Sequence, residues 1–293
     1  MESIGRLKRL MAVGLLVFAT LAFPGALCAE EEKPTGDFTV SAMSQYFWRG
    51  YELSRNSVAI QPSMTIGYKG FSANFWGNLD TQPYSTGATN YSNTWNETDL
   101  TLSYSKSLGL VTLGGGYIYY ALGSLNKDAP KRADSQELFV TASLDTLLSP
   151  TLTVYKEIDR YKQWYFLLGI SHAFELSSVV SLKLGASASY LLSTYADAGL
   201  FNAGAGYGGY PKFDSSSAAT NEKFSNFHDG SLSASLPIKA TGQITVTPTV
   251  SWIFPLSDDA KYEMKGQGLK GTAAASDRDS SYITGGLALS FSF

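Results

Sequence analysis

The chain has 293 residues, of which 44% are hydrophobic, 13% aromatic and only 16% charged. This apolar and aromatic content excludes an intrinsically disordered chain. The single cysteine excludes a disulfide framework and a cysteine-rich zinc site. A formal net charge of −3 offers no basic surface for nucleic acid, so no nucleic-acid partner is expected. The mean hydropathy of −0.05 argues against a polytopic helical membrane protein, but a β-barrel membrane protein passes this test.

Residues 1–29 are predicted to be a cleaved secretory signal peptide. Three basic residues precede an apolar stretch at 10–23. A Pro-Gly pair then precedes a predicted cleavage site after the small residue Ala29. The alternatives are an uncleaved signal anchor and a lipoprotein processed at Cys28. An acidic lead at 30–36 then precedes a single predicted domain at 37–293. Loss of the leader would change the formal net charge from −3 to −5, because three basic residues and one acidic residue leave with it.

Apolar and polar residues alternate with a period of two along nearly all of the predicted domain. In 281–293, for example, Ile283, Leu287 and Phe291 share one face, while Thr284 and Ser290 share the other. Alternation of this kind predicts β-strands. No window after the leader has a convincing 3.6-residue period, so helices are not expected. Twelve strands are predicted, at about 38–50, 57–68, 70–79, 96–106, 109–122, 134–146, 150–159, 162–174, 178–191, 229–239, 242–254 and 280–293.

The connections between these strands alternate in length. Every second connection is tight, whereas most of the others are long, polar and rich in Gly, Ser, Asn and Asp. Short periplasmic turns and long outer loops are typical of outer-membrane barrels, whereas a soluble sandwich has no reason to sort its loops in this way. The tight connections are 69–70, 107–109, 147–150, 175–178 and 240–241; the long ones are 81–95, 123–133, 196–227 and 255–279; short exceptions occur near 53–56 and 160–161.

Aromatic residues of the outward-facing parity fall into two bands, with aliphatic residues between them. Such bands are expected where a barrel meets the two interfaces of a bilayer, so outer-membrane lipid and lipopolysaccharide are expected partners. The outer band is Tyr46, Trp48, Tyr117, Tyr119, Trp164, Phe166, Tyr190, Trp252 and Phe254; the inner band is Tyr68, Phe71, Tyr104, Phe174, Phe291 and Phe293.

The chain ends in Leu-Ser-Phe-Ser-Phe, with Phe293 on the lipid-facing parity. This ending resembles the C-terminal signature of bacterial outer-membrane proteins, which implies recognition by the barrel-insertion machinery. The fold class predicted is therefore all-β, a single closed antiparallel up-and-down transmembrane barrel of about 12 strands. It would lie in the bacterial outer membrane.

The inward-facing parity is rich in Ser, Thr, Gly and Ala, which would leave room for water. The larger inward groups are few, and the charged ones among them allow three interpretations: they set the selectivity of a pore, they pair with one another and fill the barrel, or they simply solvate its walls. The pore-lining candidates are Arg49, Gln61, Asn74, Trp76, Asp99, Tyr120, Glu137, Asp145, Glu157 and Lys183. Aromatic residues of the outer loops would either line a solute path or pack within the loops: Tyr84, Tyr91, Trp95, Phe201, Tyr207 and Tyr210.

Catalytic chemistry is not predicted. Of the two histidines, His172 is predicted to face the lipid near the inner rim of the barrel. His228 is expected to be exposed to solvent at the start of a strand that follows a long loop. The aspartates of the last loop, at 258–259, 277 and 279, lack the spacing of a defined calcium loop, so no metal site is assigned. The glycine run at 114–116 lies within a strand and is expected to serve close packing, so no cofactor is assigned either.

The segment Ser44-Gln45-Tyr46-Phe47-Trp48-Arg49-Gly50 is followed by Ile60-Gln61-Pro62, Gly70-Phe71 and Phe75-Trp76-Gly77-Asn78. These motifs span about 40 residues and resemble the N-terminal part of the TorF family of porin-like proteins. In that family the first strand ends in aromatic-x-x-Arg-Gly, the second strand contains a Gln and the third contains Trp-Gly. The resemblance implies an outer-membrane channel without a known solute. By position, Arg49 and Gln61 match the motif and face the lumen.

The sequence thus predicts a channel for passive diffusion of small hydrophilic solutes. The alternatives are a non-conducting barrel whose long loops bind a partner or surface ligand, and an outer-membrane lipid hydrolase. Three prolines, Pro62, Pro237 and Pro248, fall inside predicted strands, where each removes a backbone donor, so they are expected to mark bulges, strand ends or errors of one to two residues in the predicted register.

Overall fold

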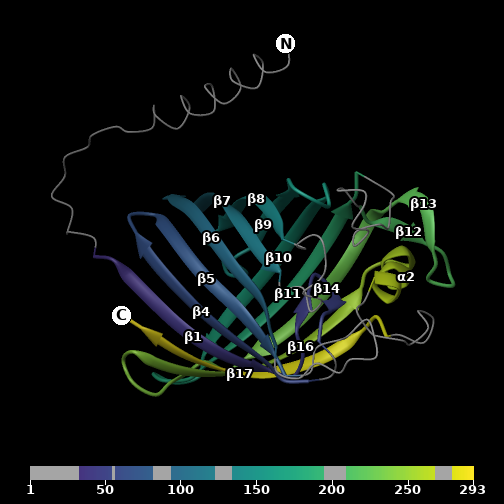
Figure 1. Cartoon of the computed structure of the whole chain (residues 1–293). Helices are drawn as coiled ribbons and strands as arrows, with labels where there is room; N and C mark the ends of the chain where they lie inside the picture. Colours follow the sequence, from purple (N-terminus) through teal and green to yellow (C-terminus); the bar gives the residue numbers. More distant parts are fainter. Residues whose placement is uncertain (1–32, 55–56, 82–93, 123–133, 195–208, 268–278) are drawn as a thin grey trace, which may run out of the picture. The chain divides into compact units, whose positions relative to one another are not determined.

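The computed structural model describes residues 33–54, 57–81, 94–122, 134–194, 209–267 and 279–293. Residues Pro34–Phe293 form one compact unit, and this unit is an antiparallel β-barrel (Figure 1). The predicted signal peptide lies outside the described residues and stays a prediction.

Twelve antiparallel strands form the ring, which confirms the predicted fold class. The ring closes because the last strand pairs with the first, from Asp37 opposite Ser292 to Met43 opposite Gly286. In spatial order the strands are β1 (Thr35–Met43), β4 (Ala59–Tyr68), β5 (Phe71–Asp80), β6 (Thr94–Leu108), β7 (Val111–Leu122), β8 (Ser135–Leu144), β9 (Thr151–Glu157), β10 (Trp164–Glu175), β11 (Ser181–Leu192), β14 (Ser225–Ser235), β16 (Ile244–Pro255) and β17 (Tyr282–Ser292).

The two ends of the barrel differ as predicted. The tight connections, the start of β1 and the end of β17 lie at one end of the barrel, which we call the turn end. We call the opposite end the loop end. At the turn end β4 and β5 are joined by Lys69 and Gly70, both with positive φ, as in the two-residue turns that match strand twist. In the described residues, the connections at the loop end contain four short strands and one helix: β12 (Pro211–Phe213), which pairs with β13 (Ala219–Lys223), the two-residue β2 (Phe47–Trp48), which pairs with β3 (Tyr51–Glu52), and α2 (Asp258–Gln267).

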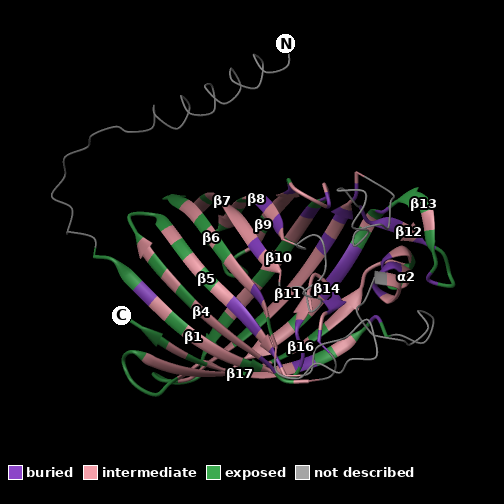
Figure 2. Cartoon of the chain, in the orientation of Figure 1, coloured by how far each residue is buried: buried purple, intermediate pink, exposed green. Residues whose placement is uncertain are grey.

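More and less buried residues alternate along the strands (Figure 2), as expected where successive side chains point to opposite faces of the wall. The exposed exterior is apolar, as shown by Met64, Ile66, Leu102, Leu287 and Leu289, which are 47–55% exposed to solvent in the isolated barrel. A closed ring satisfies its backbone hydrogen bonds internally, so this exterior suits the hydrocarbon of a bilayer. A barrel with such an exterior has the architecture of an outer-membrane protein.

The prolines mark irregularities, as expected. In β4, the pairing with β5 is interrupted beside Pro62, between Ile60–Leu79 and Ser63–Trp76. Pro237 lies between β14 and the short β15 (Ile238–Lys239), and Pro248 on β16 lies opposite this break in the ladder. The inward and outward parity nevertheless holds on both sides of each proline.

The prediction that Tyr46 and Trp48 belong to the outer aromatic band is wrong. Strand β1 ends at Met43, earlier than the predicted residue 50, and the chain then turns into the barrel. Tyr46 is buried and its ring packs on the inward-facing Trp76, with ring centroids 5.5 Å apart. Trp48 likewise packs on the inward-facing Tyr120. The parity argument fails here because the strand no longer pairs with its neighbours.

The expectation that the barrel has no helix is also wrong, because α2 forms in the last loop. Ser257 begins the helix by accepting a hydrogen bond from the backbone N–H of Ala260 (3.1 Å), and two acidic residues occupy the first turn. Its buried face consists of Ala260, Glu263 and Met264. Because one of these three buried residues, Glu263, is charged, the apolar residues of α2 show no recognisable 3.6-residue period in the sequence. Within the described residues no helix is both long and apolar enough to cross a bilayer.

The glycine run at 114–116 serves close packing, as predicted. A Cβ placed on Gly116 would lie 2.3 Å from the backbone oxygen of Leu102 and 2.8 Å from the ring of Phe139. We therefore expect Gly116→Ala to lower the free energy of unfolding by roughly 1–3 kcal/mol, since the backbone neighbour cannot move aside. Urea unfolding in lipid vesicles would measure it. Gly169→Ala is the matched control, because its Cβ would approach no atom closer than 3.9 Å; an equal loss in both variants would contradict the packing explanation.

Candidate functional site: the barrel lumen

The inner wall near the turn end is lined by hydroxyl groups. These side chains are neither fully buried nor fully exposed, and several bond across strands, such as Ser187 with Ser231 (2.7 Å) and Thr141 with Thr153 (3.1 Å). Hydroxyl groups that are reachable by solvent can hydrate a passing solute. The partly exposed inward hydroxyls include Ser41, Ser63, Thr65, Thr101, Ser103, Thr112, Thr141, Ser143, Ser187, Ser231 and Ser233.

The lumen near the loop end is crossed by residues 44–54, which we call the inner hairpin. Its side chains contact inward-facing side chains on both sides of the ring, from Trp76 on β5 to His228 on β14. At its tip, the Arg49 guanidinium lies over the ring of Tyr155 on β9. In the ring β9 is six strands away from β1, where the hairpin begins, so the hairpin spans the full width of the barrel.

The guanidinium of Arg49 occupies a cage made by four neighbouring strands of the wall. Nη1 and Nη2 donate to the two carboxylate oxygens of Glu137 on β8, at 2.8 and 2.6 Å. The guanidinium carbon lies 4.3 Å from the ring centroid of Tyr165 on β10 and 4.8 Å from that of Tyr155. Tyr120 on β7 donates to the same Glu137 carboxylate (2.9 Å). The Arg49 and Glu137 side chains are only 9% and 1% exposed, so this is a buried ion pair.

The tip of the inner hairpin has an unusual backbone. Arg49 has a φ of 47° and Gly50 a φ of 81°, as in the two-residue turns in which both central residues have positive φ. A non-glycine residue in this region costs of order 1 kcal/mol. The positive φ favours glycine at position 50, and a Cβ there would also lie 3.0 Å from Cβ of Asp229 and 2.8 Å from the terminal methyl group of Met264 on α2.

Acidic side chains lie beside the cage. On β6, the buried Glu97 and the partly buried Asp99 both point inward, and one carboxylate oxygen of Asp99 has no hydrogen-bond partner among the described residues. Glu52 of the inner hairpin is buried and accepts a hydrogen bond from Gln45. Among the described residues near Arg49, buried and partly buried carboxyl groups therefore outnumber basic side chains.

Glu157, another predicted pore-lining residue, organises a connection instead of facing solvent. Its carboxylate is 1% exposed and accepts hydrogen bonds from the hydroxyl of Ser135 (2.9 Å) and from the backbone N–H groups of residues 159–162, at 2.6–3.0 Å. These donors satisfy the carboxylate completely. The contacts fix the turn between β9 and β10.

The other candidates divide into two groups. Gln61 bonds to Asn78 (3.1 Å), and Asn74 donates to the hydroxyls of Ser63 and Thr65 (2.9 and 2.8 Å), all on the inner wall. Asp145 and Lys183 lie instead at the turn end, Asp145 in the connection after β8 and Lys183 near the start of β11; both are exposed. The structure therefore brings Arg49, Asp99, Tyr120 and Glu137 together and leaves these two apart.

The expectation for His228 is wrong, because this side chain is fully buried. A bulge in the pairing of β11 with β14 places both His228 and Asp229 toward the lumen. His228 Nδ1 lies 3.0 Å from Asp229 Oδ1, and Nε2 lies 2.9 Å from Glu263 Oε2 on α2. Asp229 also accepts hydrogen bonds from Tyr165 and Ser189. The only signal for this network in the sequence was the adjacent pair His228-Asp229, because neither the bulge nor the helix could be predicted.

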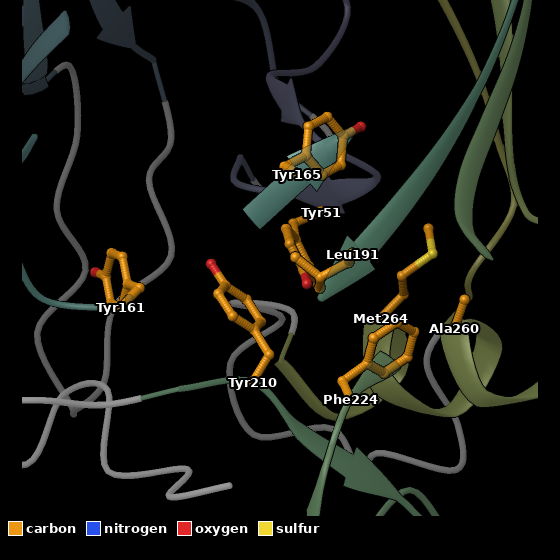
Figure 3. Close-up of a cluster of buried hydrophobic side chains, with 8 residues drawn as sticks. All are labelled: Tyr51, Tyr161, Tyr165, Leu191, Tyr210, Phe224, Ala260 and Met264. Atoms are coloured by element: carbon orange, nitrogen blue, oxygen red, sulfur yellow. The ribbon is translucent and has the colours of Figure 1, made fainter. Parts of the chain in front are cut away.

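A cluster of aromatic and apolar side chains surrounds this network (Figure 3). Tyr51 of the inner hairpin stacks on Tyr210 (ring centroids 6.0 Å apart) and donates to Glu263 (2.7 Å). Burial raises the pKa of Tyr161, in the connection after β9, to about 12, so this phenol stays neutral at physiological pH. The cluster fastens the hairpin to α2 and to the wall; its members are Tyr51, Tyr161, Tyr165, Leu191, Tyr210, Phe224, Ala260 and Met264.

Two of the loop aromatics are described, and they behave differently. Tyr210 packs within the cluster, as the packing interpretation predicted, whereas Trp95 is 47% exposed on β6 and covers Gly77. Tyr84, Tyr91, Phe201 and Tyr207 lie outside the described residues, as does Asp277. His172 is close to the ring of Phe174, as its parity indicated, and bonds to the Leu147 carbonyl.

The loop aspartates that the structure describes take part in local contacts. Asp259 accepts a hydrogen bond from Asn226 (2.9 Å) and forms an ion pair with Lys212 (3.3 Å). In the described part of the chain, no group of three or more His, Cys, Asp or Glu side chains is placed to hold a metal ion.

No protein-family model matches the chain, and no curated protein is similar to it in sequence. The resemblance to the TorF family therefore stays a prediction. Among solved structures, the NanC porin is 13% identical, with a TM-score of 0.48, over 87% of this chain and 98% of its own. The KdgM porin is 11% identical, with a TM-score of 0.48, over 88% and 99%. The COG4313 outer membrane channel of Pseudomonas putida F1 is 10% identical, with a TM-score of 0.47, over 93% and 100%. Similarity at this level carries no information on what passes through the present barrel.

Proposed function

We propose that this chain is an outer-membrane channel for the passive diffusion of small hydrophilic solutes. The observation that supports it most is the inner wall of hydroxyl groups, which remain partly accessible inside a closed ring of twelve strands. A barrel stabilised only by a filled interior would place apolar or fully paired side chains there. The inner hairpin, with Arg49 at its tip, would be the constriction.

A second candidate is a non-conducting barrel whose loops bind a partner. Two features of the inner hairpin favour this candidate. The hairpin reaches across the lumen to β9, and it is attached to α2 by the hydrogen bond from Tyr51 to Glu263. Lipid, lipopolysaccharide, the barrel-insertion machinery acting through Phe293 and the absence of enzyme activity remain predictions.

Planar-bilayer recording of the refolded chain without residues 1–29 tests the proposal. We expect discrete conductance steps in simple salt and a preference for cations, because buried carboxylates outnumber the basic groups around the constriction. Arg49→Ala should increase this preference, since Glu137 would then lack its counter-charge. The Lys183→Ala variant, at the exposed turn end, is the control and should alter selectivity less. Silent bilayers containing correctly folded protein would favour the second candidate.

A further inference from the structure

The four side chains of the cage belong to the barrel wall, whereas Arg49 belongs to the inner hairpin, as does Trp48, whose ring centroid lies 4.6 Å from the guanidinium carbon. Glu137, Tyr120, Tyr155 and Tyr165 come from β8, β7, β9 and β10, which are hydrogen-bonded neighbours in the sheet. The occupant, Arg49, reaches them from the opposite side of the ring. The cage residues therefore belong to strands of the barrel wall, whereas Arg49, which occupies the cage, belongs to a loop that folds into the lumen.

Partners other than Arg49 hold the cage in place. Tyr165 donates to Asp229 (2.8 Å), which is in turn held by His228 and Ser189. The ring of Tyr155 packs between those of Phe139 and Tyr165, at centroid distances of 5.8 and 6.1 Å. The Tyr120 hydroxyl bonds to Glu137. Because these contacts do not involve the guanidinium, the cage is preorganised for a ligand of this shape and charge.

The chemistry of the cage defines its ligand. A carboxylate that accepts two parallel N–H bonds matches the planar fork of a guanidinium, and the two neighbouring aromatic rings of Tyr155 and Tyr165 favour a flat, weakly hydrated cation. A positive φ at Arg49 shows that the hairpin adopts an unfavourable backbone to place this group.

We propose that the cage of Glu137, Tyr120, Tyr155 and Tyr165 is a solute subsite for guanidinium-bearing cations, which Arg49 occupies in the resting barrel. A solute of this class competes with Arg49 and thereby loosens the inner hairpin. The proposal rests on the proposed channel function, of which it names the solute class.

Chemical rescue tests the subsite without relying on conductance. Arg49→Ala empties the cage and leaves Glu137 buried without its counter-charge, so we expect a lower urea midpoint in lipid vesicles. Millimolar methylguanidinium should raise this midpoint in a saturable manner. Methylurea, which has the same shape without charge, should not, and ethylammonium, which is charged but not planar, should act more weakly. In Arg49→Ala combined with Glu137→Gln, the rescue by methylguanidinium should be lost.

Equal effects of the three compounds, or equal rescue in the single and double variants, would overturn the subsite. If Arg49→Ala does not fold by itself, its refolded yield with each compound gives the same comparison. The two proposals fail separately. Rescue with silent bilayers would reject the channel but keep the cage, whereas a conducting wild-type barrel without rescue would reject the cage and keep the channel.

Discussion

Removal of the inner hairpin is expected to increase the single-channel conductance severalfold. The change is replacement of residues 46–54 by a short Gly-Ser linker, so that the ring and its closure stay intact. The hairpin extends from the end of β1 to Arg49, which lies over Tyr155 of β9, and it places the buried side chains of Tyr46, Arg49 and Tyr51 inside the loop end. A wider path lowers the resistance of the pore, and conductance is set by its narrowest part. Single-channel recording of the refolded variant in planar bilayers measures the effect.

Shortening of the turn between β12 and β13, at residues 214–218, is the matched control. This turn lies in a separate two-stranded sheet outside the ring, and Asp214, Ser215 and Ser216 in it are exposed. Its loss should leave conductance near the wild-type value. If both variants conducted like the wild type, the hairpin would not be the constriction.

The substitution Glu137→Ala is expected to lower the free energy of unfolding by about 3–5 kcal/mol, the cost of breaking a buried ion pair by removing one partner. Arg49 would keep its charge in a cage in which its side chain is only 9% exposed, and Tyr120 would lose its acceptor. Urea unfolding in lipid vesicles, followed by tryptophan fluorescence, measures this loss. Guanidinium chloride is unsuitable as denaturant because the cage is proposed to bind that cation.

Replacement of both partners, Arg49→Met with Glu137→Leu, is the informative control. With neither charge present, no uncompensated ion is buried, so the double variant should be more stable than Glu137→Ala alone. A double variant that is no more stable than the single one would show that the loss comes from packing around Glu137 and not from the stranded charge.

Much of this fold could be predicted from local patterns. The period of two along 281–293 assigned Ile283 and Leu287 to the exterior and Thr284 and Ser290 to the lumen, and the structure agrees. The glycine run at 114–116 marked a close contact between neighbouring strands, and Pro62 and Pro237 marked interruptions of the strand pairing. These predictions succeed because the pleat of a strand couples each residue to its own neighbours in sequence.

The functional groups at the loop end were only partly foreseen. Arg49 and Glu137 were both identified as inward-facing, but pairing between them and general solvation of the walls were left open, since they are 88 residues apart. The bulge that turns His228 inward, and the helix that supplies Glu263, were missed. The two-residue strands of the inner hairpin were missed as well, because Tyr46 and Trp48 continue the alternation of β1 after its pairing has ended.

The sequence by itself determined the number of strands in the ring, the face of most wall residues, the closure of the ring and the sorting of its connections, because a bilayer outside and water inside select residues at a strictly local period. Only the tertiary structure decided what lies in the lumen. A buried charge is stable only beside a partner, and the partners of Arg49, His228 and Tyr51 come from strands and a helix that are distant in sequence and adjacent only once the ring has closed.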